Sequence, residues 1–361
     1  MSARHTALAA GIFALLFVWW RAFARHEELV VYCAHDAIHA EKVLRDFEKR
    51  TGIPVAIRFD TEATKSLGLV ELLLREKDAP RCDVFWNNEL LGTLDLAEHG
   101  ILEPYSGAGA ARIPAAFKDA GGLWTGFAAR LRVYIFNTHS TQVDGIVTGP
   151  EAFAGQGVST LTAVKHPWPD DRSIPPGADL SRMAIAKPLY GTTLTHYSVL
   201  WNTWGDAKLQ AWHHDWRRRH VRELNGNAAV KDAVAEGVCD SGFTDTDDFF
   251  EAKDEGKPVA MMPVRLENNG TICIPNTVAI IRGAKHPANA RKLVDFLLSE
   301  ETELAFANSK SRQIPLGSVP ADLLSSEVRE LVGWAKDGVD LTHLGPARTA
   351  CLAWLKAEYL R

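Results

Sequence analysis

Apolar and polar residues follow two different periods in the first hundred positions of the chain. Runs with the length and composition of short strands occupy 28–34, 54–60 and 82–88. The segments between them, at 37–52 and 65–78, repeat apolar residues every three or four positions, which is typical of amphipathic helices. Strands that alternate with helices of this length predict an α/β fold, with a parallel sheet covered by helices on both faces.

The pattern changes after residue 122. A long strand-like stretch at 122–138 is suited to carry the chain from one domain into another. A segment rich in Pro and Asp at 166–181 predicts a loop insertion, and the residues after 318 predict an amphipathic helical tail. The other expected elements are a helix at 90–100, a strand at 182–188, helices at 190–205 and 206–221, strands within 257–283 and a helical hairpin at 286–309.

Length and composition indicate a folded protein with two domains. The 361 residues are enough for two separate cores. The apolar share of 46% and the charged share of 24% are those of an ordinary globular protein. A formal net charge of −5 offers no basic surface, so nucleic acid is not an expected partner. The one basic run, at 216–220, is expected on a solvated helix face.

The N-terminus has the layout of a secretory signal. Arg4 precedes an unbroken apolar run at 7–20, which is shorter than the ~20 residues of a comfortable membrane span. The A-x-A sequence at 22–24 offers a cleavage site, whereas Arg21 and the tryptophans before it also suit an uncleaved anchor. Residues 1–26 are therefore predicted to be a signal peptide or an N-terminal anchor, and the protein is predicted to be periplasmic or otherwise extracytoplasmic.

The cysteines do not form a recognisable metal motif. They lack the C-x-x-C spacing of a structural zinc site. Outside the cytosol disulfides are permitted, but an odd number of cysteines leaves at least one thiol unpaired in a monomer. The sequence determines no pairing, and burial as small apolar residues is the simplest expectation. The residues concerned are Cys33, Cys82, Cys239, Cys273 and Cys351.

The stretch SGFTDTDDFF at 241–250 concentrates three carboxylates, Asp245, Asp247 and Asp248, within four positions. The residues alone leave three interpretations open: the start of a helix, a catalytic or metal-binding cluster, and one wall of a ligand cleft. Acids in the first turn of a helix complement its dipole, and carboxylates are oxygen ligands that hard cations prefer. The same acids can both begin a helix and face a cleft.

Five segments form an ordered set at suitable spacing: LVVYCAHDAIHAEKVLRDFEKRTGIPVAIRFDTEATKSLGLVELL, DVFWNNELLGTLDLAEHGILEPY, AIAKPLYGTTLTHYSVLWNTWG, TDTDD and PNTVAIIRGAKHPANARKLVDFLLSEETE. Together they resemble the periplasmic solute-binding proteins of ABC importers, in the branch that includes the ferric-ion-binding proteins. The resemblance covers roughly residues 28–318 and leaves out the insertion at 166–181 and the tail.

This resemblance implies a two-lobe periplasmic-binding-protein fold of type II, with parallel-rich sheets, helices on both faces and a hinge of crossing strands. Such a protein captures a small ligand between its lobes by hinge closure and delivers it to the membrane permease of an ABC importer. It works as a monomer, without catalysis and without a cofactor. The implied organisation is lobe 1 at 27–126 and 266–317, lobe 2 at 127–265, and a C-terminal extension at 318–361.

Two groups of candidate ligand-binding residues match functional positions of the family. His35 and Asp36 follow the first strand, in a loop that often holds a histidine ligand in ferric-binding relatives. Capping of the next helix is the alternative role for Asp36. Arg130 lies on the long strand and matches an arginine of the family's crossing segment. It either pairs with an anion or braces a carboxylate across the hinge.

Further candidates follow other strands, because ligands of such sheets bind beyond the carboxyl ends of strands. Asn87 and Asn88 either line the cleft or cap the helix that begins at about residue 90. Gly191, Thr192 and Thr193 begin a helix, where free backbone N–H groups and the dipole favour an anion. Capping alone explains this turn equally well.

The remaining candidates are Thr244, Asp245, Asp247 and Asp248. Ferric-binding relatives carry adjacent tyrosines, whose phenolates bind iron, where this sequence has Asp247 and Asp248. The departure puts tyrosinate–iron chemistry in doubt. The expected ligand is a ferric ion or another small cation, with or without an anion, and Asp247 and Asp248 are the candidate metal ligands.

An exported enzyme is the alternative function, with Asp245, Asp247 and Asp248 as metal ligands or acid–base groups. The D-x-D-D sequence at 245–248 fits an acid motif of some cyclases and, loosely, the nucleophile motif of haloacid-type phosphatases. The phosphatase motif requires a hydrophobic strand before the aspartates, and VCDSG at 238–242 is a poor strand. A sensory or interaction module that kept the two-lobe fold is a third hypothesis.

Overall fold

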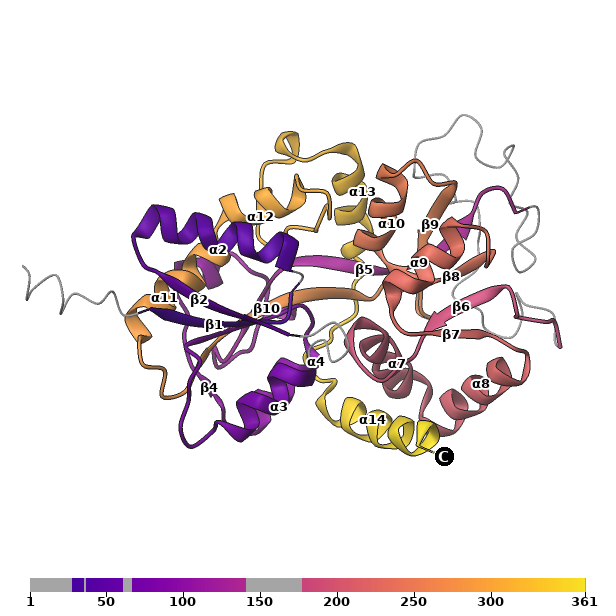
Figure 1. Ribbon diagram of the computed structural model, residues 1–361, viewed down its shortest axis with the longest axis horizontal. Helices are drawn as coiled ribbons and strands as arrows, with labels where there is room; N and C mark the ends of the chain where they lie inside the picture. The colour runs from indigo at the N-terminus through magenta and orange to yellow at the C-terminus, as the bar shows by residue number, and fades with distance from the viewer. Residues whose placement is uncertain (1–27, 36, 61–66, 141–176, 361) are drawn as a thin grey trace, which may run out of the picture.

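The computed structural model describes residues 28–35, 37–60, 67–140 and 177–360, which form two lobes joined by long strands (Figure 1). The predicted signal or anchor at 1–26, the candidate Asp36 and most of the insertion at 166–181 lie outside these ranges. No helix within them is both long and apolar enough to cross a membrane.

Lobe 1 is built around the parallel strands of the N-terminal region. β1 pairs in parallel with β2 and β3. The first helix packs on this sheet through Ala40, Leu44 and Phe47, which are spaced by a helical turn and are fully buried. The elements of this lobe are β1 (Leu29–Cys33), α2 (Ala37–Thr51), β2 (Val55–Phe59), α3 (Leu67–Arg75), β3 (Val84–Asn87), α4 (Leu91–Glu98), β4 (Leu102–Glu103), α5 (Ala108–Ala111), α11 (Pro287–Leu297) and α12 (Glu300–Ala307).

Lobe 2 repeats the same principle with a second group of strands. β6 pairs in parallel with β7 and β8, and helices connect these strands. The elements of this lobe are β6 (Met183–Ala186), α7 (Gly191–Trp204), α8 (Asp206–Arg218), β7 (Arg222–Leu224), α9 (Asn227–Ala235), β8 (Ser241–Asp245), α10 (Thr246–Asp254) and β9 (Val259–Pro263).

Two antiparallel strands, β5 (Thr125–Asn137) and β10 (Cys273–Ile281), cross between the lobes and make one continuous sheet. The strand order is β2-β1-β3-β10-β5-β8-β6-β7, with β4 on β10 and β9 on β5. β10 pairs with β3 in lobe 1, and β5 pairs with β8 in lobe 2. The predicted two-lobe α/β fold with crossing strands is confirmed, and pairing is parallel inside each lobe and antiparallel at the crossing.

The crossing is kinked at Ala128. This residue has a positive φ of 43°, and the β5–β10 register shifts between Ile274 and Asn276 opposite it. The Ala128 N–H donates to the buried carboxylate of Glu303 at 3.3 Å, and its carbonyl accepts from the Asn276 amide. A left-handed alanine costs about 1 kcal/mol, so these contacts maintain a bend that the chain alone disfavours.

The elements predicted from periodicity are present, with boundaries shifted by a few residues. The segment 222–240, for which no element was predicted, contains β7 and α9. The view that a strand is lacking before the aspartates is wrong, because SGFTD at 241–245 forms β8 and is fully buried. Its polar side chains obscured the strand signal. They are tolerated in the core because they are hydrogen-bonded there.

The C-terminal tail is helical and contacts both lobes. It contains α13 (Ser326–Ala335) and α14 (Gly345–Tyr359). Arg348 of α14 forms an ion pair of 2.8 Å with Asp95 on α4 of lobe 1. Farther along the same helix, Trp354 packs against Trp201 on α7 of lobe 2, with ring centroids 5.8 Å apart. The predicted domain boundaries at 26, 126, 265 and 317 stay predictions.

All five cysteines are buried in the structure. Burial raises the pKa of Cys273 to about 12, so this thiol is protonated at neutral pH and behaves as a small apolar residue.

Candidate functional site

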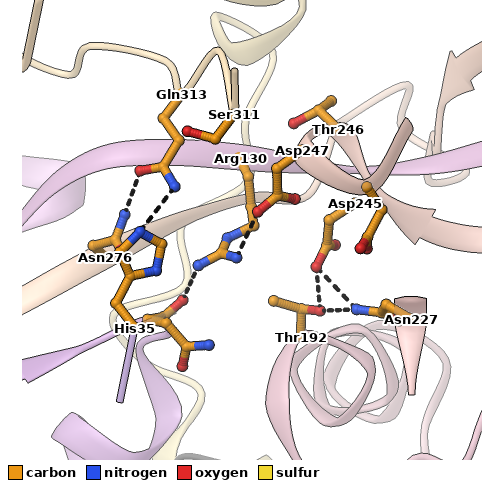
Figure 2. A network of polar contacts seen from close by, with 12 residues as sticks. His35, Arg130, Thr192, Asn227, Asp245, Thr246, Asp247, Asn276, Ser311 and Gln313 are labelled. Carbon is orange, nitrogen blue, oxygen red and sulfur yellow. Dashed lines mark hydrogen bonds and ion pairs between the residues drawn. The ribbon is translucent and has the colours of Figure 1, made fainter. Parts of the chain in front are cut away.

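Polar side chains from both lobes gather around β5 where the lobes meet (Figure 2). The topology explains this, because β8 and its parallel neighbour β6 end at the same edge of the sheet, where α7 and α10 begin. Figure 2 shows His35, Asn276 and Gln313 on one side of Arg130, and Thr192, Asn227 and Asp245 on the other.

Asp245 is the last residue of β8 and lies inside a dense hydrogen-bond network. Its carboxylate pairs with Arg132 Nη1 at 2.8 Å and accepts from the Thr192 hydroxyl at 2.6 Å and from Asn227 Nδ2 at 3.0 Å. Asp245 is 2% exposed and Arg132 is 0% exposed. Although Asp245 holds the N-cap position of α10, its side chain makes no capping hydrogen bond. Its carboxylate neutralises a buried guanidinium instead.

Arg130 connects the two lobes. Its Nη1 forms an ion pair with Asp247 Oδ2 at 2.9 Å, and Asp247 lies in the first turn of α10 in lobe 2. Its Nη2 donates to the backbone carbonyl of Asn88 at 2.6 Å, in the loop after β3 of lobe 1. Of the two roles that the sequence left open for Arg130, the structure contains the brace to a carboxylate.

Asp248 lies beside Asp247 in the first turn of α10 and accepts a hydrogen bond of 2.5 Å from the Thr244 hydroxyl. Burial, and after it the negative charges of Asp247 and Asp245, raises the pKa of the Asp248 carboxyl to about 8. One carboxylate oxygen from each of the three aspartates lies within 4.8 Å of the others. Both the helix start and the clustering predicted for these acids are therefore present.

His35 forms the lobe 1 side of the junction. Its ring is 3% exposed and packs against Trp86 and Phe306, with centroid distances of 5.5 and 5.9 Å. The ring Nε2 lies 3.4 Å from the amide nitrogen of Gln313, whose oxygen accepts from the Asn276 amide at 2.9 Å. The aromatic and amide contacts fix the orientation of the imidazole beside the junction.

The two asparagines at the C-terminal end of β3 have different roles. The Asn87 side chain is fully buried and donates to Glu89 at 3.1 Å and to Thr93 at 3.3 Å. The cap of α4 comes from Glu89, whose carboxylate accepts from the backbone N–H groups of Leu91 and Gly92. These contacts make Asn87 a support of the α4 start. Asn88 supplies the backbone carbonyl that accepts a hydrogen bond from Arg130.

The start of α7 faces a carboxylate of the same chain. Gly191 has a φ of +60°, which suits glycine, and the Thr192 hydroxyl donates to Asp245. The Thr193 hydroxyl donates to Asn227 Oδ1 at 3.1 Å. The Thr192 and Thr193 hydroxyl groups thus belong to the network around the Asp245 carboxylate, and the two interpretations of this turn, anion binding and capping, stay predictions.

Several polar residues of the junction were not among the candidates. Arg132 shares its strand face with Arg130, two residues away, and this period-2 signal was available in the sequence. Asn227 begins α9 directly after β7, at another strand end. Asn276 and Gln313 lie in β10 and in the segment after α12, and no local pattern marks them.

Two α/β lobes joined by crossing strands, with buried polar groups at their junction, define a solute-binding protein of the type II two-lobe class. The family model described as "Bacterial extracellular solute-binding protein" matches residues 42–336, and the chain belongs to this family.

Individual relatives agree with this assignment. The chain is 23% identical over 331 residues to iron uptake protein A1 of Synechocystis, with 89% of this chain and 84% of that protein covered. The apo ferric-ion-binding protein A of Pasteurella haemolytica superposes with a TM-score of 0.73 at 19% identity, covering 92% of this chain and 97% of that one. The periplasmic binding protein AfuA of Actinobacillus pleuropneumoniae, with fructose-6-phosphate bound, gives 0.71 at 20% identity, covering 92% and 99%.

Proposed function

We propose that this protein is the solute-binding component of an ABC importer. Outside the cytoplasm it captures a small ligand at the lobe junction and delivers it, as a monomer, to a membrane permease. The observation that carries the proposal is the pair of Arg130 contacts, to Asn88 in lobe 1 and to Asp247 in lobe 2. Arg130 belongs to the crossing strand β5 and contacts both lobes, so it is placed to respond to a ligand bound between the lobes.

Binding on this proposal is a shift between lobe arrangements and needs no cofactor. A ligand that contacts both lobes binds the closed form more tightly than the open form, and only this difference in affinity moves the equilibrium. The strands β5 and β10 are the covalent hinge through which the lobes rotate.

The names of the relatives point to more than one class of ligand for a protein with this function. One is named for iron uptake, one for ferric ion, and one structure holds a phosphorylated sugar. A ferric ion or another small cation, with Asp247 and Asp248 as oxygen ligands, is the class proposed from the sequence.

The alternative of an exported enzyme has less support. General acid–base chemistry requires a carboxyl group that changes its protonation state during the reaction. Asp245 and Asp247 are each engaged in an ion pair with an arginine, so of the three acids only Asp248 is without such a partner in the described part of the chain. Membership of a solute-binding family supports binding without catalysis.

Identification of the bound ligand tests the proposal. The exported protein would be purified without denaturation and examined by native mass spectrometry and elemental analysis. The expected result is a small ion or molecule in about one copy per chain, lost when Asp247 and Asp248 are both replaced by Asn. The apo melting temperature of this variant is expected to fall, because Asp247→Asn leaves the nearly buried Arg130 guanidinium without the acid that it pairs with at 2.9 Å. Ligand loss is therefore scored only after circular dichroism shows that the variant is folded.

The control is Asp240→Asn. Asp240 forms an ion pair of 2.6 Å with Arg182, away from the junction. Retention of the ligand by the double variant, together with a lower apo melting temperature, would show that the two acids are structural. Ligand release by the control as well would contradict the placement of the site.

A further inference from the structure

We infer that Arg130 acts as a built-in cation at the lobe junction, so that the ligand is an organic solute without net charge rather than a bare metal cation. The inference rests on the proposed solute-binding function and specifies the class of solute. The inference starts from the carboxylates at the junction. A highly charged metal ion needs free carboxylate ligands, whereas Asp245 and Asp247 are already paired with arginines.

Two of the three clustered carboxylates are already neutralised by arginines of the same strand. Arg130 lies 2.9 Å from Asp247, and Arg132 lies 2.8 Å from Asp245. A guanidinium group does not lose its proton in proteins, so both positive charges are permanent. Among the described residues Asp248 forms no ion pair, and it is the only one of the three acids without an arginine partner.

The guanidinium of Arg130 is held in place from both sides. Its side chain is 5% exposed, and its second nitrogen donates to the carbonyl of Asn88 at 2.6 Å. To reach Asp247, a metal cation would have to break an ion pair and then remain a few ångströms from the displaced positive charge. Repulsion grows with the charge of the ion and is weakly screened at a buried position, so a trivalent ion is disfavoured most.

A solute without net charge meets no such conflict. Carboxylates and guanidinium groups each take part in several hydrogen bonds, and an ion pair therefore still binds hydroxyl or amide groups. Thr192 and Asn227, which bind Asp245, and Gln313, which binds Asn276, add hydroxyl and amide groups on the two sides of Arg130 (Figure 2). This alternation of donors and acceptors matches a solute rich in hydroxyl groups.

The test is a gain of cation binding in Arg130→Gln. Terbium(III), followed by its sensitised luminescence, and ferric nitrilotriacetate, followed by calorimetry, are the probes. The wild-type protein is expected to bind neither, and the variant is expected to bind terbium(III) at least about tenfold more tightly than the wild type. Arg130→Lys, which keeps the charge but loses the two-armed geometry, should exclude both cations as the wild type does.

The matched control is Arg182→Gln. Arg182 pairs with Asp240 at 2.6 Å, next to the far ends of β6 and β8 in the same lobe. Circular dichroism melts establish that each variant is folded before binding is measured. No gain of cation binding by the control is expected, whereas an equal gain by the control and by Arg130→Gln would assign the effect to net charge and overturn the inference.

Further outcomes separate a failure of this inference from a failure of the proposed function. Tight binding of ferric nitrilotriacetate by the wild type overturns the inference while leaving the proposed function intact. Failure of the folded Arg130→Gln protein to gain cation binding removes Arg130 as the cause of exclusion and also overturns it. A copurified organic molecule without net charge supports it. A wild-type protein that carries no ligand and binds no solute, charged or uncharged, contradicts the proposed function itself.

Discussion

Replacement of Asp245 by Asn is the sharpest test of how the junction is built. The substitution keeps the size of the side chain but removes the charge that neutralises Arg132 at 2.8 Å. Arg132 is fully buried, and its Nε and Nη2 have no hydrogen-bond partner in the described part of the chain. No second acid is therefore positioned to replace Asp245.

Breaking one half of a buried ion pair typically costs about 3–5 kcal/mol, because the remaining charge is left uncompensated. At ~2–4 °C per kcal/mol for a folding unit of this size, the melting temperature should fall by roughly 6–20 °C. Calorimetry on the ligand-free protein, together with urea unfolding, measures the loss. Asp240→Asn is the comparison, because its partner Arg182 is 55% exposed and exposed pairs contribute about 0–1 kcal/mol.

A double variant with Arg132→Met and Asp245→Leu removes both charges of the pair together. Replacing a buried pair by apolar side chains is often close to neutral, so most of the loss should be recovered. An Asp245→Asn protein that melts within about 1 °C of the wild type, or above it, would refute the reasoning. Removing the Asp245 charge would then cost the apo fold no stability, and ligand binding rather than folding would be the role left for this acid.

Three further outcomes follow from local geometry. Ala128→Gly should cost about 1 kcal/mol less than Ala129→Gly, since only Ala128 has a positive φ that glycine relieves, and urea unfolding of the two variants measures the difference. Gly191→Ala should lower stability by about 1 kcal/mol through backbone strain alone, because an added Cβ meets no atom within 4 Å, and melting of the apo protein checks this. Burial lowers the pKa of His213 from 6.5 to about 4, so the unfolded chain takes up its proton first and stability falls by up to about 3 kcal/mol between these values. His213→Gln should flatten that acid limb in melts recorded from pH 7 to 4, and an unchanged limb would contradict it.

The alternating pattern of the sequence predicted most elements of both lobes because their helices are amphipathic and their strands short and apolar. It failed in the segment 222–240 and at β8, where short strands carry Ser, Thr and Asp. β8 lies in the middle of the sheet between β5 and β6, and its polar groups are satisfied by distant partners. A strand stabilised by distant contacts leaves no local apolar signature.

The gathering of polar residues at the lobe junction was predictable, but the ion pairs within it were not. Polar residues at strand ends identified the junction, because the topology of such sheets collects strand ends at one edge. Which arginine meets which acid depends on strand register, since Arg132 is directly opposite Asp245 in the β5–β8 pair, 113 positions away in sequence. A shift of one residue would have exchanged the faces of both arginines. The sequence records the residues but not this register.

The C-terminal helix α14 gives the lobes a point of attachment away from β5 and β10. It is fixed to lobe 2 through Trp354 and through the Tyr359 hydroxyl, which donates to Glu223, while Arg348 reaches Asp95 in lobe 1. Two strands alone would permit the lobes to twist about the strand direction as well as to bend toward each other. A connection away from the strands is expected to restrict this twisting. Part of the orientational entropy that a loosely joined pair of lobes would lose on binding is thereby removed in advance, which leaves more of the contact energy for affinity.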